Sequence, residues 1–351
     1  MKRAFVYLLL MFMLTSAFAG CAYGSAPGRV YELTVSHQWP ATGRVETIVA
    51  RWSAEVEAAT NGQVKITSYP ANTLTSSREN YEGVVQGISD IGMVPYSHLA
   101  GRFPIVEAFM LPGFASFNNA AAGGAALNEY IRTHNPAELS YTQHLFSFST
   151  GANVLLSEQP LRSVEDLKGL PLGVTQAERA NMMNLLGATP ISLAMPEWYE
   201  ALQRNLIVGG ITSPEALRGH MVGDVSCSYI LNSPLFGSTI FYCVMNIDVF
   251  NSLPADCQEV LLEAPDYFLN AWDELSVDAI EFTREKKSVE IISLSDAETA
   301  RWIELMAPMH KANIDALNAR GIDGEALHKT IIELENKYNA LYPYSLADRF
   351  N

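Results

Sequence analysis

The segment between Ser163 and Pro214 constrains the fold more than any other part of the chain. Ser163 with Asp166 three positions later is a capping pair that opens a short helix. The apolar run 171–174 then has the length of a buried parallel strand, residues 178–186 follow as a helix, and a second strand comes next. This order predicts a strand–helix–strand unit, in which ligands bind beyond the carboxyl ends of the strands.

The amino-terminal half repeats the alternation of strand and helix. A strand at 31–36, a helix at 44–60 and a strand at 64–68 follow one another. The chain has 351 residues, of which 48% are hydrophobic and 17% charged, so it is long and apolar enough for a sizeable core. These features predict an α/β protein with parallel sheets covered by helices, built either as two lobes or as one large domain.

The carboxyl-terminal third is predicted to be mostly helical. Strands at 229–231 and 238–246 are expected to return the chain to the first part of the fold. Residues 254–287 are expected to form one long helical stretch that is kinked at Pro265. A last amphipathic helix is predicted at 324–342.

Residues 1–20 are predicted to be a secretory signal peptide, because two basic residues precede an apolar run and small residues follow it. The apolar run is shorter than the ~20 residues that a membrane span requires. Two outcomes stay open: ordinary cleavage after Ala19, or lipidation of Cys21 at an imperfect lipoprotein box with Phe18 where leucine is usual. Both predict export to the periplasm, and no later run is long and apolar enough to span a bilayer.

The remaining cysteines are Cys227, Cys243 and Cys257. An oxidising compartment permits a disulfide between Cys227 and Cys243, and buried free thiols are the simpler alternative. The spacing is not that of a zinc site.

Charge and motif content exclude several function classes. The formal net charge of −15 argues against nucleic acid or an anionic membrane as partner, because both bind basic surfaces. The sequence contains no nucleophile elbow, no zinc-protease helix motif, no phosphate-binding loop and no dinucleotide fingerprint. A catalytic triad assembled from distant segments stays open, since triads are defined by geometry. The expectation is a protein without metal or cofactor that is not an enzyme.

Four motifs of the central segment occur in a characteristic order. They are Asp-Leu-Lys-Gly-Leu at 166–170, Leu-Gly-Ala-Thr-Pro at 186–190, Glu-x-Tyr-x-Ala-Leu at 197–202 and Gly-x-x-x-Pro at 210–214. This succession resembles the DctP-type solute-binding proteins of tripartite ATP-independent periplasmic (TRAP) transporters. The similarity covers nearly all of the chain from about residue 31.

The resemblance implies a two-lobe periplasmic-binding-protein fold of type II-like architecture, in which each lobe is a mixed, mostly parallel sheet flanked by helices. Hinge strands and a long helix would join the lobes. Residues 30–150 would form the first part of lobe I, 151–234 lobe II, 235–255 the return to lobe I, and 256–351 helices that bridge and cover both lobes. The implied function is capture of a small organic solute and its delivery to the membrane subunits of a TRAP transporter, without nucleotide or other cofactor. The oligomeric state is left open.

The positions that line the ligand cleft in the family can be carried over one at a time. They suggest a ligand site formed by His37, Trp39, Tyr96, Ser97, Asn153, Gly173, Gln176, Glu178, Ser213 and Phe236. Several of these residues have structural alternatives: Trp39 as packing between the lobes, Tyr96 as the end of a strand, Asn153 as part of a turn, and Glu178 as a charge that complements a helix dipole. His37 is expected to satisfy a backbone hydrogen bond in addition to, or instead of, contacting ligand.

The family's clamp arginine, which holds a ligand carboxylate, falls on Gly173 in this chain. A buried carboxylate costs several kcal/mol unless it is paired, and glycine cannot pair it. We therefore predict a neutral, cationic or aromatic ligand, enclosed by Trp39, Tyr96 and Phe236, with Glu178 as counter-charge. The alternative is that Arg179 or Arg102 replaces the lost arginine and a carboxylate still binds.

Two further function classes remain as alternatives to transport. One is a ligand-sensing lipoprotein that passes its bound state to a receptor. The other is an enzyme built on a binding-protein scaffold.

Overall fold

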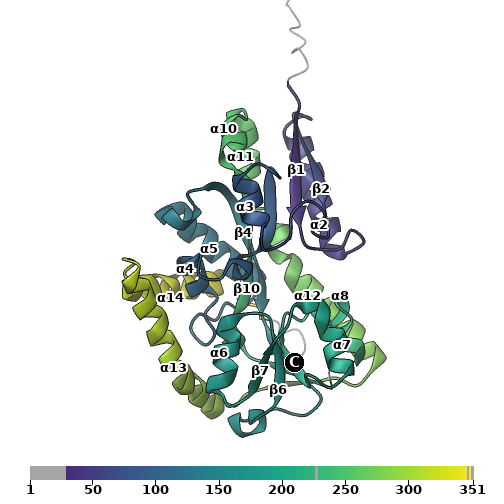
Figure 1. Ribbon diagram of the computed structural model, residues 1–351, viewed down its shortest axis with the longest axis vertical. Helices are drawn as coiled ribbons and strands as arrows, with labels where there is room; N and C mark the ends of the chain where they lie inside the picture. Colours follow the sequence, from purple (N-terminus) through teal and green to yellow (C-terminus); the bar gives the residue numbers. More distant parts are fainter. Residues whose placement is uncertain (1–28, 226–227, 346–347, 349–351) are drawn as a thin grey trace, which may run out of the picture.

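The computed structural model describes residues 29–225, 228–345 and 348. The elements form two lobes stacked along the long axis of the molecule, each with its own β-sheet and flanking helices (Figure 1). The predicted signal peptide, the candidate lipidation site Cys21 and the cysteine Cys227 lie outside the described residues. Within the described part, Cys243 and Cys257 are buried free thiols.

The upper lobe contains a five-stranded sheet in the order β2-β1-β3-β10-β4. β1 pairs in parallel with β2 and β3, whereas β10 runs antiparallel to both β3 and β4. The strands are β1 (Tyr31–His37), β2 (Val64–Tyr69), β3 (Ile91–Pro95), β4 (Thr142–Ala152) and β10 (Ser238–Asn246). The predicted alternation of strand and helix therefore forms a mixed sheet, and β10 enters it late in the chain.

Helices cover both faces of this upper sheet. In α2, Val45, Val49, Trp52 and Val56 recur at helical spacing and are buried against the sheet. In α5, small residues allow close approach to β4: a Cβ at Gly124 would lie 3.3 Å from the Cα of Phe148. The helices of this lobe are α2 (Arg44–Ala59), α3 (Asn80–Val85), α4 (Pro104–Phe109), α5 (Ala120–His134), α10 (Ile247–Asn251) and α11 (Ala255–Leu262).

The lower lobe contains a six-stranded sheet in the order β11-β9-β5-β8-β6-β7. The predicted strand–helix–strand unit is β6, α6 and β7, and β6 pairs with β7 in parallel. The strands are β5 (Val154–Ser157), β6 (Pro171–Val174), β7 (Thr189–Ser192), β8 (Gly209–Thr212), β9 (Tyr229–Asn232) and β11 (Glu290–Ser293). The helices are α6 (Ala177–Leu185), α7 (Trp198–Gln203), α8 (Ala216–Gly219) and α9 (Val222–Val225). The strand predicted at 229–231 does not return to the first lobe, because β9 pairs with β5 and β11 in the lower sheet.

Three long helices complete the fold: α12 (Asp266–Lys286), α13 (Asp296–Ala319) and α14 (Gly324–Leu341). α12 crosses from one lobe to the other, since Trp272 packs in the upper core and Ile280 in the lower core. α13 also crosses, with Trp302 in the lower core and Leu317 in the upper core (Figure 1). Pro265 does not kink a continuous helix, because α11 ends at Leu262 and Pro265 is the N-cap of α12.

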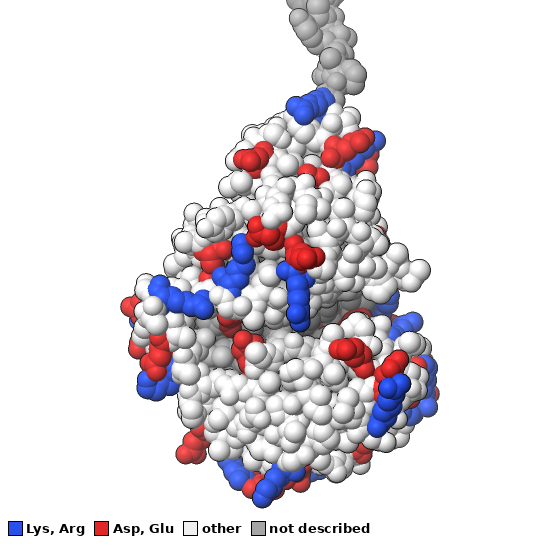
Figure 2. Space-filling model, in the orientation of Figure 1, with Lys and Arg blue, Asp and Glu red and all other residues white. Residues whose placement is uncertain are grey.

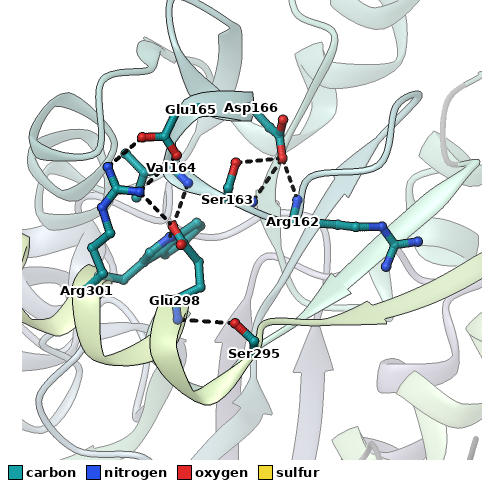
Figure 3. Close-up of polar contacts among 9 residues, drawn as sticks. Arg162, Ser163, Val164, Glu165, Asp166, Ser295, Glu298 and Arg301 are labelled. Atoms are coloured by element: carbon teal, nitrogen blue, oxygen red, sulfur yellow. Dashed lines mark hydrogen bonds and ion pairs between the residues drawn. The ribbon is translucent and has the colours of Figure 1, made fainter.

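Polar contacts join the turn before β6 to α13 and so hold this helix on the lower lobe (Figure 3). The predicted capping pair is confirmed, since Ser163 and Asp166 form a capping box at the 3₁₀ helix Val164–Leu167. The Val164 amide donates to Glu298 of α13 at 2.7 Å, and Arg301 of the same helix pairs with Glu165 at 2.5 Å. Among the described residues, no helix combines the length with the hydropathy that crossing a membrane requires.

Candidate ligand-binding cleft between the lobes

A cleft lies between the two lobes at the start of α6. The space between the atoms here is about 250 Å³ when the open solvent at the mouth is counted, and Figure 2 shows the surface indented between the upper and lower lobes. Its walls come from both lobes: Ser97, Ala100, Glu107 and Met110 from the upper lobe, and Gln176 and Glu178 from the lower lobe. Among the predicted site residues, Ser97, Gln176 and Glu178 are thus brought together on this cleft.

The local sequence explains why these residues face one another. β3 ends at Pro95, and a 3₁₀ helix from Tyr96 to Leu99 carries Ser97. On the opposite side, β6 ends at Val174 and the chain reaches α6 through Gln176, which has an extended backbone at the N-cap position. The first N–H groups of a helix have no partner within the helix, so the start of α6 presents free donors at the lower wall.

Acidic side chains stand on opposite walls of the cleft. Glu107 of α4 accepts a hydrogen bond from the Gly101 amide at 2.5 Å. Burial raises the pKa of the Glu107 carboxyl, and the negative charge of Glu178 across the cleft raises it further. One carboxylate from each lobe therefore faces the cleft.

The three aromatic rings that were expected to enclose the ligand lie mainly in the cores of the two lobes. Trp39 is half-buried and packs against Phe148, Phe241 and Trp272 of the upper lobe. Tyr96 is fully buried, and its hydroxyl lies 3.1 Å from Ser147 Oγ. Phe236 is fully buried in the lower lobe and packs against Trp302. Contact of these rings with a ligand stays a prediction.

His37 is fully buried at the end of β1 and is hydrogen-bonded to side chains. Its Nε2 lies 2.7 Å from Glu46 Oε2 and 2.9 Å from Ser68 Oγ. Burial lowers the pKa of His37, although the Glu46 carboxylate acts in the opposite direction. Its Nδ1 has no hydrogen-bond partner among the described residues.

Gly173 has no room for a side chain. A Cβ at this position would lie 2.8 Å from Ile207 Cδ1 and 2.9 Å from Trp198 Cζ2. Trp198 also covers Gly210, which pairs with Gly173 across β6 and β8. The space beside the expected clamp position is therefore filled by an indole ring.

Polar groups without partners gather at the edge of the lower sheet that meets the upper lobe. Asn153 donates from Nδ2 to the Gly237 carbonyl at 2.8 Å, and its Oδ1 has no partner. Because Val154 pairs with Thr212, the antiparallel register places Asn153 next to Ser213, whose buried Oγ is also unpartnered. The Ser238 Oγ at the start of β10 is a third such atom within the described residues.

Arg179, in the first turn of α6, is the most unusual group in this region. Its side chain is buried, with 1% of the residue surface exposed. Nη2 donates to the Ser238 carbonyl at 3.0 Å and to Thr239 Oγ1 at 3.1 Å. Nε is buried without a partner, and no carboxylate of the described chain forms an ion pair with it. Burial lowers the pKa of Arg179 to about 10, which still leaves it charged at neutral pH.

Arg179 lies directly behind the wall of the cleft. Gln176, which lines the cleft, donates to the same Thr239 hydroxyl at 3.4 Å. The other candidate, Arg102, is on the surface of the upper lobe, 3.7 Å from Glu82 and over the ring of Tyr81. The sequence contained one signal for Arg179. A cation in the first turn of a helix is unfavourable with the helix dipole, so its presence there indicates a specific role.

The donor set does not suggest a metal centre. No group of three or more His, Cys, Asp or Glu side chains in the described ranges could hold a metal ion. The chemistry that this region offers is hydrogen bonding and charge pairing with a small molecule.

Comparison with known proteins gives one consistent result. Residues 35–316 match the family described as bacterial extracellular solute-binding protein, family 7, or DctP. The C4-dicarboxylate-binding periplasmic protein DctP of Rhodobacter capsulatus is 22% identical over 286 residues, covering 78% of this chain and 83% of that protein.

Solved structures show the same architecture. A TRAP periplasmic solute-binding protein from Desulfovibrio salexigens is 29% identical, with a TM-score of 0.80, and the match covers 88% of this chain and 96% of that chain. A marine metagenome TRAP solute-binding protein specific for aromatic acid ligands, in complex with 3-hydroxybenzoate, is 26% identical with a TM-score of 0.81; the match covers 89% of this chain and 99% of that chain. With the family match spanning most of its length, this chain belongs to the DctP family of bacterial extracellular solute-binding proteins, a family of transport receptors and not of enzymes.

Proposed function

We propose that this protein captures a small organic solute in the cleft between its lobes and delivers it to the membrane subunits of a TRAP transporter. The observation that carries the proposal is that polar residues of both lobes line one cleft, Ser97 and Glu107 from above and Gln176 and Glu178 from below. A ligand that touches both walls stabilises the closed arrangement of the lobes over the open one. The membrane partner would then recognise the closed form.

Small organic acids are the first ligand class to test. The solved structure with 3-hydroxybenzoate is 26% identical to this chain, and that protein is specific for aromatic acid ligands. A second candidate class is the neutral or cationic solute predicted from the glycine at position 173. Glu107 and Glu178 on opposite walls of the cleft support this second class, because two carboxylates favour a cation between them.

A matched ligand panel separates these classes. Thermal-shift and calorimetric titrations would compare 3-hydroxybenzoate, benzoate and C4-dicarboxylates with the neutral 3-hydroxybenzamide and the cationic benzylamine. A bound solute raises the melting temperature with its concentration, because it binds the folded state alone. We expect at least one class to produce saturable binding, and a chain that binds none of the classes would contradict the receptor function.

Turnover and genomic context test the alternatives to transport. Mass spectrometry after long incubation should recover the ligand unchanged, whereas a product would indicate an enzyme. Neighbouring genes for two multi-span membrane subunits would support the transport role, and a neighbouring sensor kinase would support a sensing lipoprotein. The mass of the exported chain would distinguish cleavage after Ala19 from lipidation of Cys21.

A further inference from the structure

We propose that Arg179 and the first turn of α6 anchor a carboxylate of the ligand, in place of an arginine at position 173. The inference rests on the proposed function, since it assumes a solute in the cleft beside Gln176. It assigns to this chain an organic acid whose carboxylate reaches the base of the cleft.

The burial of Arg179 requires a compensating partner. An ionised group removed from water costs several kcal/mol unless a partner compensates for the lost hydration. The hydrogen bonds to Ser238 and Thr239 involve only Nη2, and both acceptors are neutral. The guanidinium has five N–H donors, and an anion beside Nε would satisfy the missing contact as well as the charge.

The helix that carries Arg179 adds to the attraction for an anion. α6 runs from Ala177 to Leu185, and its N-cap residue Gln176 makes no side-chain capping hydrogen bond. The amide groups of the first turn and the helix dipole both favour negative charge at this end. A carboxylate seated here would contact amide donors and the guanidinium together.

The unpartnered atoms at the neighbouring sheet edge extend the site. Asn153 Oδ1 is a buried acceptor without a donor, and the hydroxyls of Ser213 and Ser238 are unpartnered as well. Asn153 and Arg179 are linked through β10, since Asn153 bonds to the Gly237 carbonyl and Arg179 to the next one, that of Ser238. A carboxylate cannot donate to Asn153, so a ligand with a hydroxyl or amino group in addition to its carboxylate fits the region best.

Access to Arg179 depends on the relative position of the lobes. Arg179 belongs to the lower lobe, whereas Ser238 and Thr239 begin β10 of the upper sheet. Movement of one lobe against the other therefore loosens the contacts of Nη2 and uncovers the guanidinium beside Gln176. The incoming carboxylate would replace the Thr239 hydroxyl at Nη2 and also accept a hydrogen bond from Nε.

The test uses the variants Arg179→Gln and Arg179→Lys, with Arg102→Gln as the matched control for loss of one arginine. The probes are 3-hydroxybenzoate and its neutral analogue 3-hydroxybenzamide, measured by calorimetry. Removing one partner of a buried charge pair costs about 2–5 kcal/mol, so Arg179→Gln should weaken binding of the acid at least about 30-fold. Arg179→Lys should retain part of the affinity, and Arg102→Gln should bind as the unaltered protein does.

The stability of the ligand-free variants separates anchoring from a structural role. If Arg179 serves to bind an anion, Arg179→Gln should melt at the same or a higher temperature without ligand, because it removes a buried charge that forms no ion pair within the described residues. A lower melting temperature together with acid affinity within about threefold of the unaltered protein would overturn the inference and leave the receptor function intact. Binding of the amide or benzylamine but of no acid by the unaltered protein would also overturn it, whereas absence of all binding would contradict the proposed function itself.

Discussion

The indole ring of Trp198 lies over the backbone of Gly173 and Gly210, where two paired strands of the lower sheet both lack a side chain. Glycine at position 173 therefore makes room for the indole ring, besides offering no side chain to a ligand. At the same time a buried arginine stands six positions further along the chain, at the start of α6. Under the proposal above, the positive charge that holds the ligand lies at the start of helix α6 and not on strand β6.

Placing an arginine at position 173 should destabilise the protein. Because even a Cβ would lie 2.9 Å from Trp198, we expect Gly173→Arg to lower the free energy of unfolding by about 1–3 kcal/mol or more and not to improve acid binding. Denaturant unfolding and calorimetry would measure the two effects. The double variant with Trp198→Ala is the informative comparison, because removing the indole should relieve part of the destabilisation caused by Gly173→Arg. Losses of unfolding free energy that simply add in the double variant would contradict the steric explanation.

Glu138 shows how a residue outside the cleft positions a helix that lines it. Glu138 accepts hydrogen bonds from the amides of Ile105 and Val106 at 3.0 and 3.1 Å, in the first turn of α4. These contacts hold the helix that carries Glu107 to the cleft wall. Burial raises the pKa of the Glu138 carboxyl to about 7, with the charge of Glu107 acting in the same direction.

This raised pKa predicts a pH dependence of stability. Between pH 4.5 and about 7 the folded protein keeps the Glu138 proton that the unfolded chain has released, so the free energy of unfolding falls as the pH rises through this window. We expect Glu138→Gln to flatten that part of the curve in denaturant unfolding at a series of pH values. Glu129 is the control of opposite sign, since its hydrogen bond from Lys337 lowers its pKa. Glu129→Gln should therefore change the pH dependence of the unfolding free energy only at acidic pH, below the window of Glu138. An unchanged slope in Glu138→Gln would contradict the assignment.

The elements also show which structural features the sequence could predict. The capping pair Ser163 and Asp166 and the β6–α6–β7 unit were predicted correctly, because caps and short apolar runs are local signals. Pro265 was expected to kink one helix and instead separates two, because proline is unfavourable inside a helix and well suited to the start of one. β9 was expected to return to the upper lobe. Its place in the lower sheet follows from its pairing with β5 and β11, which the sequence alone does not reveal.

The candidate site was predictable only in part. Ser97, Gln176 and Glu178 face the cleft because they follow the ends of strands, which sequence can locate. The filling of the space at Gly173 by Trp198, a residue 25 positions away in the sequence, is a tertiary contact without a local signal. The burial of Arg179 likewise depends on Ser238 and Thr239, which belong to the other sheet.

On the scale of the whole molecule, one aspartate joins the lobes on the side of α12. Arg44 of α2 in the upper lobe and Arg218 of α8 in the lower lobe both donate to Asp278 Oδ2, the latter at 2.5 Å. All three side chains are partly exposed, so each contact contributes about 0–1 kcal/mol. The energy is small, but it acts directly on the equilibrium between open and closed lobes.

Asp278→Asn should shift the ligand-free protein toward the open arrangement. We expect a larger radius of gyration in small-angle X-ray scattering and a loss of ligand affinity of up to about fivefold, because the solute must then supply more of the closing energy. High salt should produce the same change in the unaltered protein. Asp315→Asn is the control, since Asp315 pairs with Lys311 within a single helix. Scattering that is identical for Asp278→Asn and the control would show that this aspartate does not restrain the lobes.

The indole above the glycine pair also limits how this receptor can diverge. A lineage that places a guanidinium on β6 must first replace the tryptophan by a smaller residue, and the intermediate would carry a void in the lower core. Positions 173 and 198 should therefore change together among related receptors. Where one position carries a large side chain, the other should carry a small one. A large residue at position 198 would then indicate that such a receptor binds its ligand from the helix, and a large residue at position 173 that it binds from the strand.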